Sequence, residues 1–149
     1  MTTLSRQAAL ADLERWAARE SLSDYARLVM PDTYEQPPHV LRLIEHLEAL
    51  ERREITRLIV TMPPRSSKSL HVSRLLPSWW LGRHPEQGVI IASYGEILPT
   101  GHGRAVRDLL GHPRYPFAAR LRPDVRSAGR WQPTQGGGLI SVVVGSGIT

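Results

Sequence analysis

Short apolar runs rich in β-branched residues alternate with helix-forming segments in the last two thirds of the chain. Runs at 57–62, 89–93 and 139–144 are accompanied by segments with helical periodicity at 69–81 and 97–110. Parallel strands are buried on both faces, so apolar runs of this length are typical of them. The alternation of strands with helices therefore predicts an α/β fold, in which helices flank a parallel sheet.

The residues before the first run are predicted to form a helical lead-in. Helices are expected over about 3–20, 23–28 and 38–53, packed on the sheet-bearing part of the chain. Two apolar stripes at helical spacing should face the core: Leu10, Leu13, Trp16 and Ala17 in the first helix, and Val40, Leu43, Ile44, Leu47 and Leu50 in the third. We therefore divide the chain into a lead-in, 1–53, and a sheet-bearing part, 54–149, in which the Pro-, Gly- and Arg-rich segment 111–138 is expected to be irregular.

Lysine occurs once in this sequence, at Lys68, although the chain has 19 basic residues. A protein so biased towards arginine uses that residue wherever a generic positive charge is sufficient. A compact ammonium group fits between phosphates where a planar guanidinium is too wide. The lysine count therefore indicates a specific role for position 68.

The segment around Lys68 is predicted to bind phosphate. It lies between an expected strand and an expected helix, where backbone N–H groups and a positive helix N-terminus can surround an anion. Met62 and Ser67 stand where the usual G-x-x-x-x-G-K-[ST] pattern has glycine, so a plain surface turn is the alternative. The predicted ATP-binding residues are Pro63, Pro64, Arg65, Ser66, Ser67, Lys68 and Ser69. Lys68 would reach the β- and γ-phosphates, and the Ser69 hydroxyl would bind Mg²⁺.

The last third of the chain is strongly basic. Residues 101–149 contain seven arginines but only two carboxylates, so the whole net charge of +5 lies there. Such a field favours a polyanion such as double-stranded DNA, although a solvated basic face is the simpler interpretation. Arg104, Arg107 and Arg130 are the candidate phosphate or DNA contacts, and the first two are spaced as neighbours on one helix face.

Several segments, in order, resemble the ATPase domain of the large terminase subunits of tailed bacteriophages. The similarity covers roughly residues 25–149 and is most specific in the loop Met62-Pro63-Pro64-Arg65 followed by Lys68-Ser69. The other motifs are Pro37-Pro38-His39, Pro77-Ser78-Trp79-Trp80-Leu81-Gly82-Arg83-His84-Pro85, Ile91-Ala92-Ser93-Tyr94, Gly103 to Leu110, Gly129-Arg130-Trp131, Gly136-Gly137-Gly138 and Val144 to Thr149.

The resemblance implies a P-loop NTPase fold and an ATP-driven motor that threads viral DNA into a preformed head. Such motors work as homo-oligomeric rings docked on a portal protein, are fed by a small terminase subunit and act in the cytoplasm of the bacterial host. It also implies that Arg65 senses the γ-phosphate and that Gln36 and His39 lie near adenine. The alternative is that Gln36 belongs to an ordinary loop and His39 to a helix cap.

Hydrolysis in this family needs a second acidic motif at the end of an apolar strand. After residue 95 the carboxylates are Glu96, Asp108 and Asp124, and none ends such a strand. We therefore expect an N-terminal fragment that lacks this motif and the nuclease domain and that binds nucleotide without turning it over. A helicase-like P-loop motor and a basic nucleic-acid-binding remnant are the alternatives.

The absence of cysteine, the histidine spacing and the aromatic residues exclude some kinds of binding site and leave others open. The chain has no cysteine, which excludes disulfides and thiolate metal sites, and no apolar run long enough to predict a membrane span. Its histidines include no i, i+4 pair of the kind that binds zinc on a helix. Trp79 and Trp80 are expected in the core, with base stacking as the alternative. Tyr94 follows a strand, where it could meet a ligand or lie at the core edge.

Overall fold

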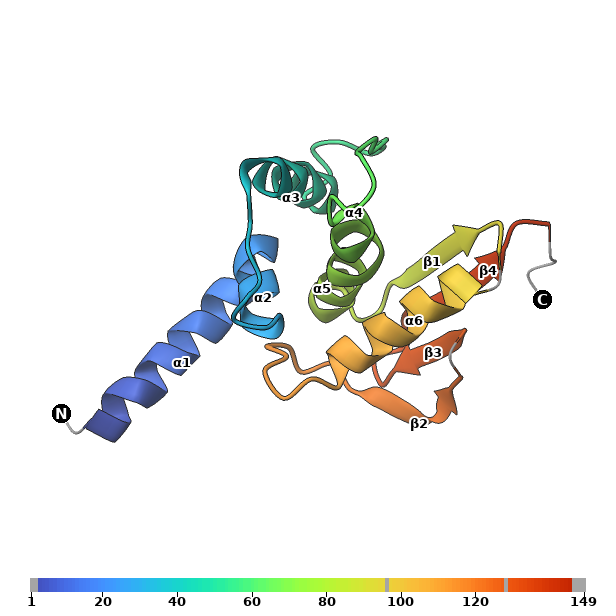
Figure 1. Cartoon of the computed structure of the whole chain (residues 1–149). Coiled ribbons are helices and arrows are strands. Elements are labelled where there is room, and N and C mark those ends of the chain that lie inside the picture. Colours follow the sequence, from blue (N-terminus) through green and yellow to red (C-terminus); the bar gives the residue numbers. More distant parts are fainter. Residues whose placement is uncertain (1–2, 96, 128, 146–149) are drawn as a thin grey trace.

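The computed structural model describes residues 3–95, 97–127 and 129–145. It is a mixed α/β structure, which confirms the prediction of helices around a sheet but not that of a parallel sheet, and its helices precede and flank one four-stranded sheet (Figure 1). The elements are α1 (Thr3–Glu20), α2 (Leu22–Val29), α3 (Pro38–Glu51), α4 (Lys68–Leu70), η1 (His71–Leu75), α5 (Leu76–Arg83), β1 (Gly88–Ser93), α6 (Ile97–Leu110), β2 (Leu121–Arg126), β3 (Arg130–Pro133) and β4 (Gly138–Val143).

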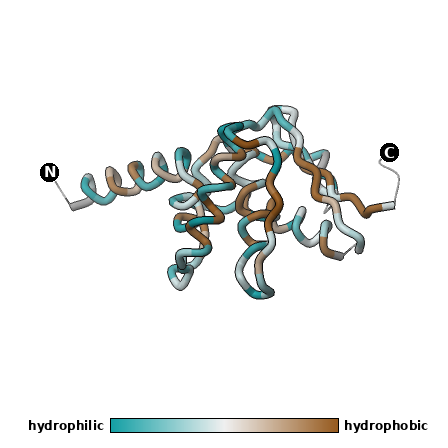
Figure 2. The backbone as a smooth tube through the Cα atoms, turned by 90° about the horizontal axis from the view of Figure 1, so that it is seen from above, coloured by the Kyte–Doolittle hydropathy of each residue, from teal (hydrophilic) through white to brown (hydrophobic). Residues whose placement is uncertain are grey.

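The sheet has the strand order β1-β4-β3-β2 and is mixed rather than parallel. Only β1 and β4 pair in parallel, with Val89 opposite Leu139, while β3 pairs antiparallel with both β4 and β2. Figure 2 shows β1 and β4 as hydrophobic stretches that run side by side. The prediction that 111–138 is irregular was wrong for 121–126 and 130–133, which form β2 and β3. A turn containing Gly136, whose φ is 100°, joins β3 to β4. β2 is an edge strand, so it needs neither a second neighbouring strand nor an apolar face.

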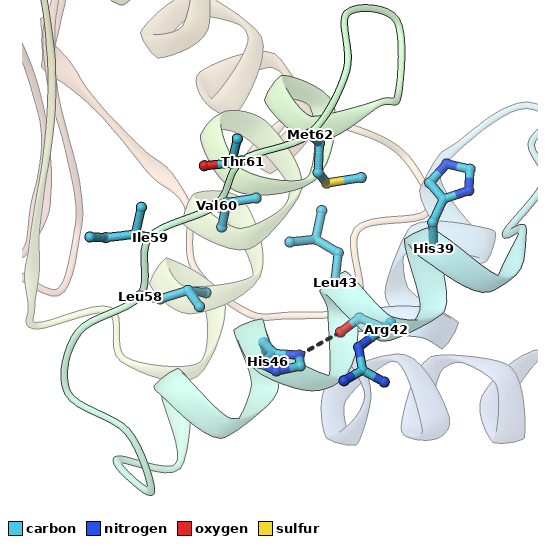
Figure 3. A pocket seen from close by; sticks show the side chains of 9 residues that line it. All are labelled: His39, Arg42, Leu43, His46, Leu58, Ile59, Val60, Thr61 and Met62. Atoms are coloured by element: carbon cyan, nitrogen blue, oxygen red, sulfur yellow. Dashed lines mark hydrogen bonds between the residues drawn. The ribbon is translucent and has the colours of Figure 1, made fainter.

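The strand predicted at 57–62 is absent. This segment is irregular, and the Ile59 side chain is 93% exposed. Leu58, Val60 and Met62 are partly buried, on the side that faces α3 (Figure 3). An apolar run becomes a strand only where a neighbouring strand completes its backbone hydrogen bonds, and here α3 covers one side of the run instead.

The helix predicted at 69–81 is present over residues 68–83, but its middle is wider than an α-helix. A π-helical turn, η1, lies between α4 and α5, and the Leu76 N–H donates to the carbonyl of His71. Pro77 explains the position of this turn, because proline has no N–H and its ring would collide with the carbonyl four residues earlier in a regular helix.

The lead-in helices pack on α5. The Trp79 indole of α5 donates to the carbonyl of Ala18 at 3.0 Å, and α2 contacts both α3 and α5. The stripe predicted on α3 is confirmed for Val40, Leu43, Ile44 and Leu47, which are buried, whereas Leu50 is only partly buried. The stripe predicted on α1 was wrong for Leu10, Leu13 and Trp16, which are 52%, 59% and 60% exposed, whereas Ala17 is partly buried. The N-terminal part of α1 extends away from the other elements (Figure 1).

The core continues from these helices to the sheet. Tyr25 of α2 meets Tyr115 edge to face, and both hydroxyls bond to Ser78 of α5. The predicted helix at 97–110 is confirmed as α6, which packs on β1 and β4, and the Trp131 indole donates to the carbonyl of Gly103 at 3.0 Å. Trp79 is 1% exposed, as expected of a core residue, and is therefore closed to base stacking.

Candidate phosphate-binding loop

Two non-glycine residues give the loop before α4 its shape. Arg65 has φ 61° and Ser67 has φ 62° and ψ 10°, so both lie in the left-handed region that favours glycine. Within the loop, the Ser66 hydroxyl donates to the carbonyl of Pro63 at 2.7 Å. Left-handed angles at non-glycine residues cost on the order of 1 kcal/mol each and persist only where surrounding contacts hold them.

The start of the helix presents N–H groups to this loop. Within the part of the chain that the structure describes, the N–H groups of Lys68, Ser69 and Leu70 have no protein acceptor, as is usual in the first turn of a helix. Residues 62–70 line a hollow of about 380 Å³, and the helix behind it continues to Arg83. Lys68 is half-buried and the Ser69 side chain is exposed. The arrangement can therefore receive an anion, since N–H donors, a helix N-terminus and an ammonium group converge there.

One buried histidine supports the loop from behind. The His71 ring is fully buried, and its Nδ1 lies 2.8 Å from the carbonyl oxygen of Ser67. Burial lowers the pKa of His71, while the hydrogen bond to Ser67 acts in the opposite direction. On its other side the ring meets the hydroxyl of Tyr34, 2.6 Å from Nε2.

A second hollow adjoins the loop and shares Met62 with it. It has a volume of about 350 Å³ and lies between α3 and the irregular segment that leads to the loop (Figure 3). His39, one of the two residues assigned to the adenine side by resemblance, lines this hollow with Arg42 and His46. The hollow thus combines an apolar wall with basic and imidazole side chains.

Gln36, the other residue assigned to the adenine side, is occupied by protein contacts. Its amide oxygen accepts from the Ser23 hydroxyl at 2.7 Å, and its Nε2 donates to the Ser23 carbonyl at 2.9 Å. A longer contact of 3.4 Å joins Nε2 to the Tyr34 hydroxyl. Gln36 therefore anchors the loop between α2 and α3.

The three predicted arginine contacts are on other elements than the loop. Arg104 and Arg107 are on α6, which packs on η1 and α5, and Arg130 begins β3, whereas the loop precedes α4. Arg107 bonds to Asp108 at 3.1 Å, while Arg104 and Arg130 are exposed. None of these three arginines lines the hollow at the loop.

No carboxylate cluster accompanies the loop. Among the described residues, no group of three or more His, Asp or Glu side chains could hold a metal ion. Asp108 pairs with Arg107 within α6, and Asp124 pairs with Arg122. Asp124 was expected in a basic loop and instead lies in β2. Glu96 lies outside the described residues.

Sequence reasoning missed Tyr34 and His71. His71 was noted only as a scattered histidine, and Tyr34 lies 37 positions away from it. The one local signal is that a histidine four residues after Ser67 can reach that residue's carbonyl across one helical turn. No periodic pattern in the sequence indicates the contact with Tyr34.

Tyr94 lies away from the core. It is 88% exposed after the end of β1, so it is not the core-edge residue that was one of its two interpretations.

Comparison of the chain with protein-family models, with curated protein sequences and with solved structures gave no match. No helix within the described residues is long and apolar enough to cross a membrane.

Proposed function

We propose that this chain is the N-terminal part of the P-loop ATPase domain of a phage terminase large subunit, and that its loop at 63–69 binds the phosphates of Mg·ATP. The observation that carries the proposal is the position of the only lysine. Lys68 lies in the first turn of a helix, beside N–H groups without protein acceptors and after a loop with two left-handed residues. This is the set of groups that phosphate binding requires.

Each loop residue has a separate role in this proposal. The Lys68 ammonium bridges the β- and γ-phosphates, and the exposed Ser69 hydroxyl binds Mg²⁺ that the nucleotide carries. Arg65 is exposed and lines the hollow at the loop, and its guanidinium would contact the γ-phosphate. The hollow that His39 lines adjoins the loop and would receive the base on its apolar wall.

The wider function follows from the resemblance. In the full-length protein the domain would drive double-stranded DNA into a phage or prophage head, in a homo-oligomeric ring that docks on a portal protein and receives DNA from a small terminase subunit. The site of action would be the cytoplasm of the bacterial host. Within residues 3–95, 97–127 and 129–145 no group of three or more His, Asp or Glu side chains could hold a metal ion. The second acidic motif that hydrolysis needs is therefore not found there, and we expect this chain to bind ATP without hydrolysing it.

Equilibrium binding of Mg·ATP, measured by calorimetry, tests the loop directly. Lys68→Ala should weaken binding by about 10- to 100-fold, since hydrogen bonds to charged groups are worth about 1.5–3 kcal/mol. Lys68→Arg should rescue little of this loss, because the guanidinium is too wide for the position. Arg6→Ala removes an equal charge on the exposed surface of α1 and is the control. Equal affinity in all four proteins would overturn the proposal.

Phosphate release by the purified chain tests the second half of the proposal. We expect none above the rate of the Lys68→Ala protein. Turnover that this substitution abolishes would show that the chain contains a working catalytic carboxylate, and the expectation of binding without hydrolysis would then be wrong.

The charge of the last third supports a second candidate function, binding of DNA without nucleotide. Seven arginines lie after residue 100. Two of them, Arg107 and Arg122, pair with carboxylates, which reduces the local field. In this case DNA affinity should fall steeply between low and moderate salt and should be the same in the Lys68→Ala protein. Salt-dependent DNA binding together with no ATP binding would favour this candidate.

A further inference from the structure

The pair formed by Tyr34 and His71 lies directly behind the phosphate-binding loop. Tyr34 comes from the segment between α2 and α3, and His71 begins the π-helical turn after α4. The Tyr34 hydroxyl is 2.6 Å from His71 Nε2, and the two ring centroids are 5.9 Å apart. The pair thus joins the lead-in to the loop through a buried side chain.

The partners of His71 determine which ring nitrogen carries the proton. Nδ1 lies 2.8 Å from the Ser67 carbonyl, and a carbonyl oxygen can only accept a hydrogen bond. Nδ1 is therefore the donor. In the neutral ring Nε2 then accepts, and the Tyr34 hydroxyl donates to it. Both ring nitrogens of His71 and the Tyr34 hydroxyl therefore have hydrogen-bond partners when Nδ1 carries the proton.

The Ser67 carbonyl receives two hydrogen bonds from the same residue. The His71 backbone N–H donates to it at 3.2 Å and the His71 ring at 2.8 Å. Ser67 is the left-handed residue immediately before Lys68, and the orientation of its peptide group determines where the helix N–H groups point. A glycine would adopt this conformation without steric cost, whereas serine needs contacts that hold it there.

The lead-in holds the other end of the pair. Gln36 reaches the Tyr34 hydroxyl at 3.4 Å, and its amide is fixed by two hydrogen bonds to Ser23 of α2. The contacts form a continuous path from α2 to the loop, through Ser23, Gln36, Tyr34, His71 and Ser67.

We propose that Tyr34 and His71 are positioning residues that hold Ser67 in its left-handed conformation, and so replace the glycine that phosphate loops usually have at this place. This inference rests on the proposed function of the loop. It implies that the lead-in preforms the phosphate site although none of its residues in this path touches phosphate.

A set of conservative variants tests this with Mg·ATP as the probe. Tyr34→Phe removes only the hydroxyl and should weaken binding by about 3- to 10-fold, the range expected for one hydrogen bond. His71→Asn keeps a donor near the Nδ1 position and should cost less than His71→Leu. In a Ser67→Gly background, Tyr34→Phe should change affinity less than about 2-fold, because glycine needs no support. An equal loss in both backgrounds would overturn the proposal.

Tyr115→Phe is the matched control for a purely structural effect. It also removes a buried tyrosine hydroxyl with a 2.8 Å hydrogen bond, here to the Ser78 carbonyl in the core. It should lower the urea midpoint of unfolding while ATP affinity stays unchanged. If it weakens ATP binding as much as Tyr34→Phe, the loss reflects general destabilisation and the positioning role is contradicted.

Nuclear magnetic resonance gives a readout that does not depend on ATP binding. The ¹⁵N shifts of His71 should show Nδ1 protonated and Nε2 as acceptor, and Tyr34→Phe should move the amide signals of residues 67–70. A protein that fails to bind ATP but shows both signals would contradict the proposed function and support the positioning role of Tyr34 and His71. If ATP binding depends on Lys68 but the amide signals are unchanged in Tyr34→Phe, the proposed function is supported and the positioning role of Tyr34 and His71 is overturned.

Discussion

Gly82 is a residue whose size matters more than its backbone freedom. It lies in the last turn of α5. A Cβ atom at this position would stand 2.7 Å from Cε2 of Phe117 and closer still to two other ring atoms. Glycine therefore allows the aromatic cluster that includes Tyr115 and Phe117 to pack directly on α5.

Gly82→Ala should destabilise the protein by about 1–3 kcal/mol, because overpacking forces the Phe117 ring or the helix to move. Gly101→Ala in α6 is the control, since no heavy atom lies within 4 Å of an added Cβ there. That change should stabilise the helix by about 0.5–1 kcal/mol. Urea unfolding measures both. A neutral Gly82→Ala protein would contradict the described packing of Phe117.

Glu51 joins the end of α3 to the end of α5. One of its carboxylate oxygens lies 2.8 Å from Arg83 Nε and 2.8 Å from His84 Nε2, and the side chain is almost fully buried. Burial raises the pKa of Glu51, but hydrogen bonds from His84 and Arg83 and their charges outweigh it, so the pKa is lowered overall. The folded protein therefore favours the ionised form.

Because the pKa of Glu51 is lower in the folded chain than in the unfolded chain, its contribution to stability is present above about pH 4.3 and is lost as pH falls below that value. Glu51→Gln should cost about 1–3 kcal/mol at neutral pH and should flatten this part of the acid dependence. Urea unfolding at a series of pH values measures the effect, with Glu45→Gln on the exposed face of α3 as control. An unchanged pH profile would contradict the described contacts.

At the scale of elements, helical periodicity alone does not decide which face is buried. Leu10, Leu13 and Trp16 of α1 are exposed, whereas Leu22 of α2 is fully buried. α2 contacts α1, α3 and α5. The same residue type therefore differs in its contribution to stability from one helix to the next.

Leu13→Ala should change the free energy of unfolding by less than about 0.5 kcal/mol, since the side chain is 59% exposed. Leu22→Ala should cost about 2–5 kcal/mol, because it leaves a cavity in the core. Chemical denaturation of both variants checks the difference. A large loss in Leu13→Ala would show that α1 packs along its whole length in solution.

At the scale of the molecule, the sheet ends in an apolar edge. β1 pairs with β4 on one side and is the outermost strand, and Ile90 on it is 62% exposed. Unpaired edges with exposed apolar side chains favour association between molecules. The segment 57–62, which the sequence predicted as a strand, lies against α3 and leaves this edge open.

Ile90→Lys should reduce self-association without unfolding the protein, because the side chain is exposed and a charge opposes edge pairing. Light scattering over a range of concentrations measures the effect. Leu41→Lys on the exposed side of α3 makes the same chemical change away from the sheet and should have a smaller effect. Equal association of wild type and Ile90→Lys would show that the edge of β1 plays no part.

The sequence by itself determined the features that depend on local pattern. The strands at 88–93 and 138–143 and the helix at 97–110 follow from apolar runs and periodicity, and the position of the candidate loop follows from the only lysine. The tertiary structure decided what depends on distant partners: that 57–62 lies on α3, that β2 and β3 complete the sheet, and that Tyr34 supports His71. The physical reason is that a strand needs another strand, and a buried polar group needs an acceptor or donor, which only another part of the chain can supply.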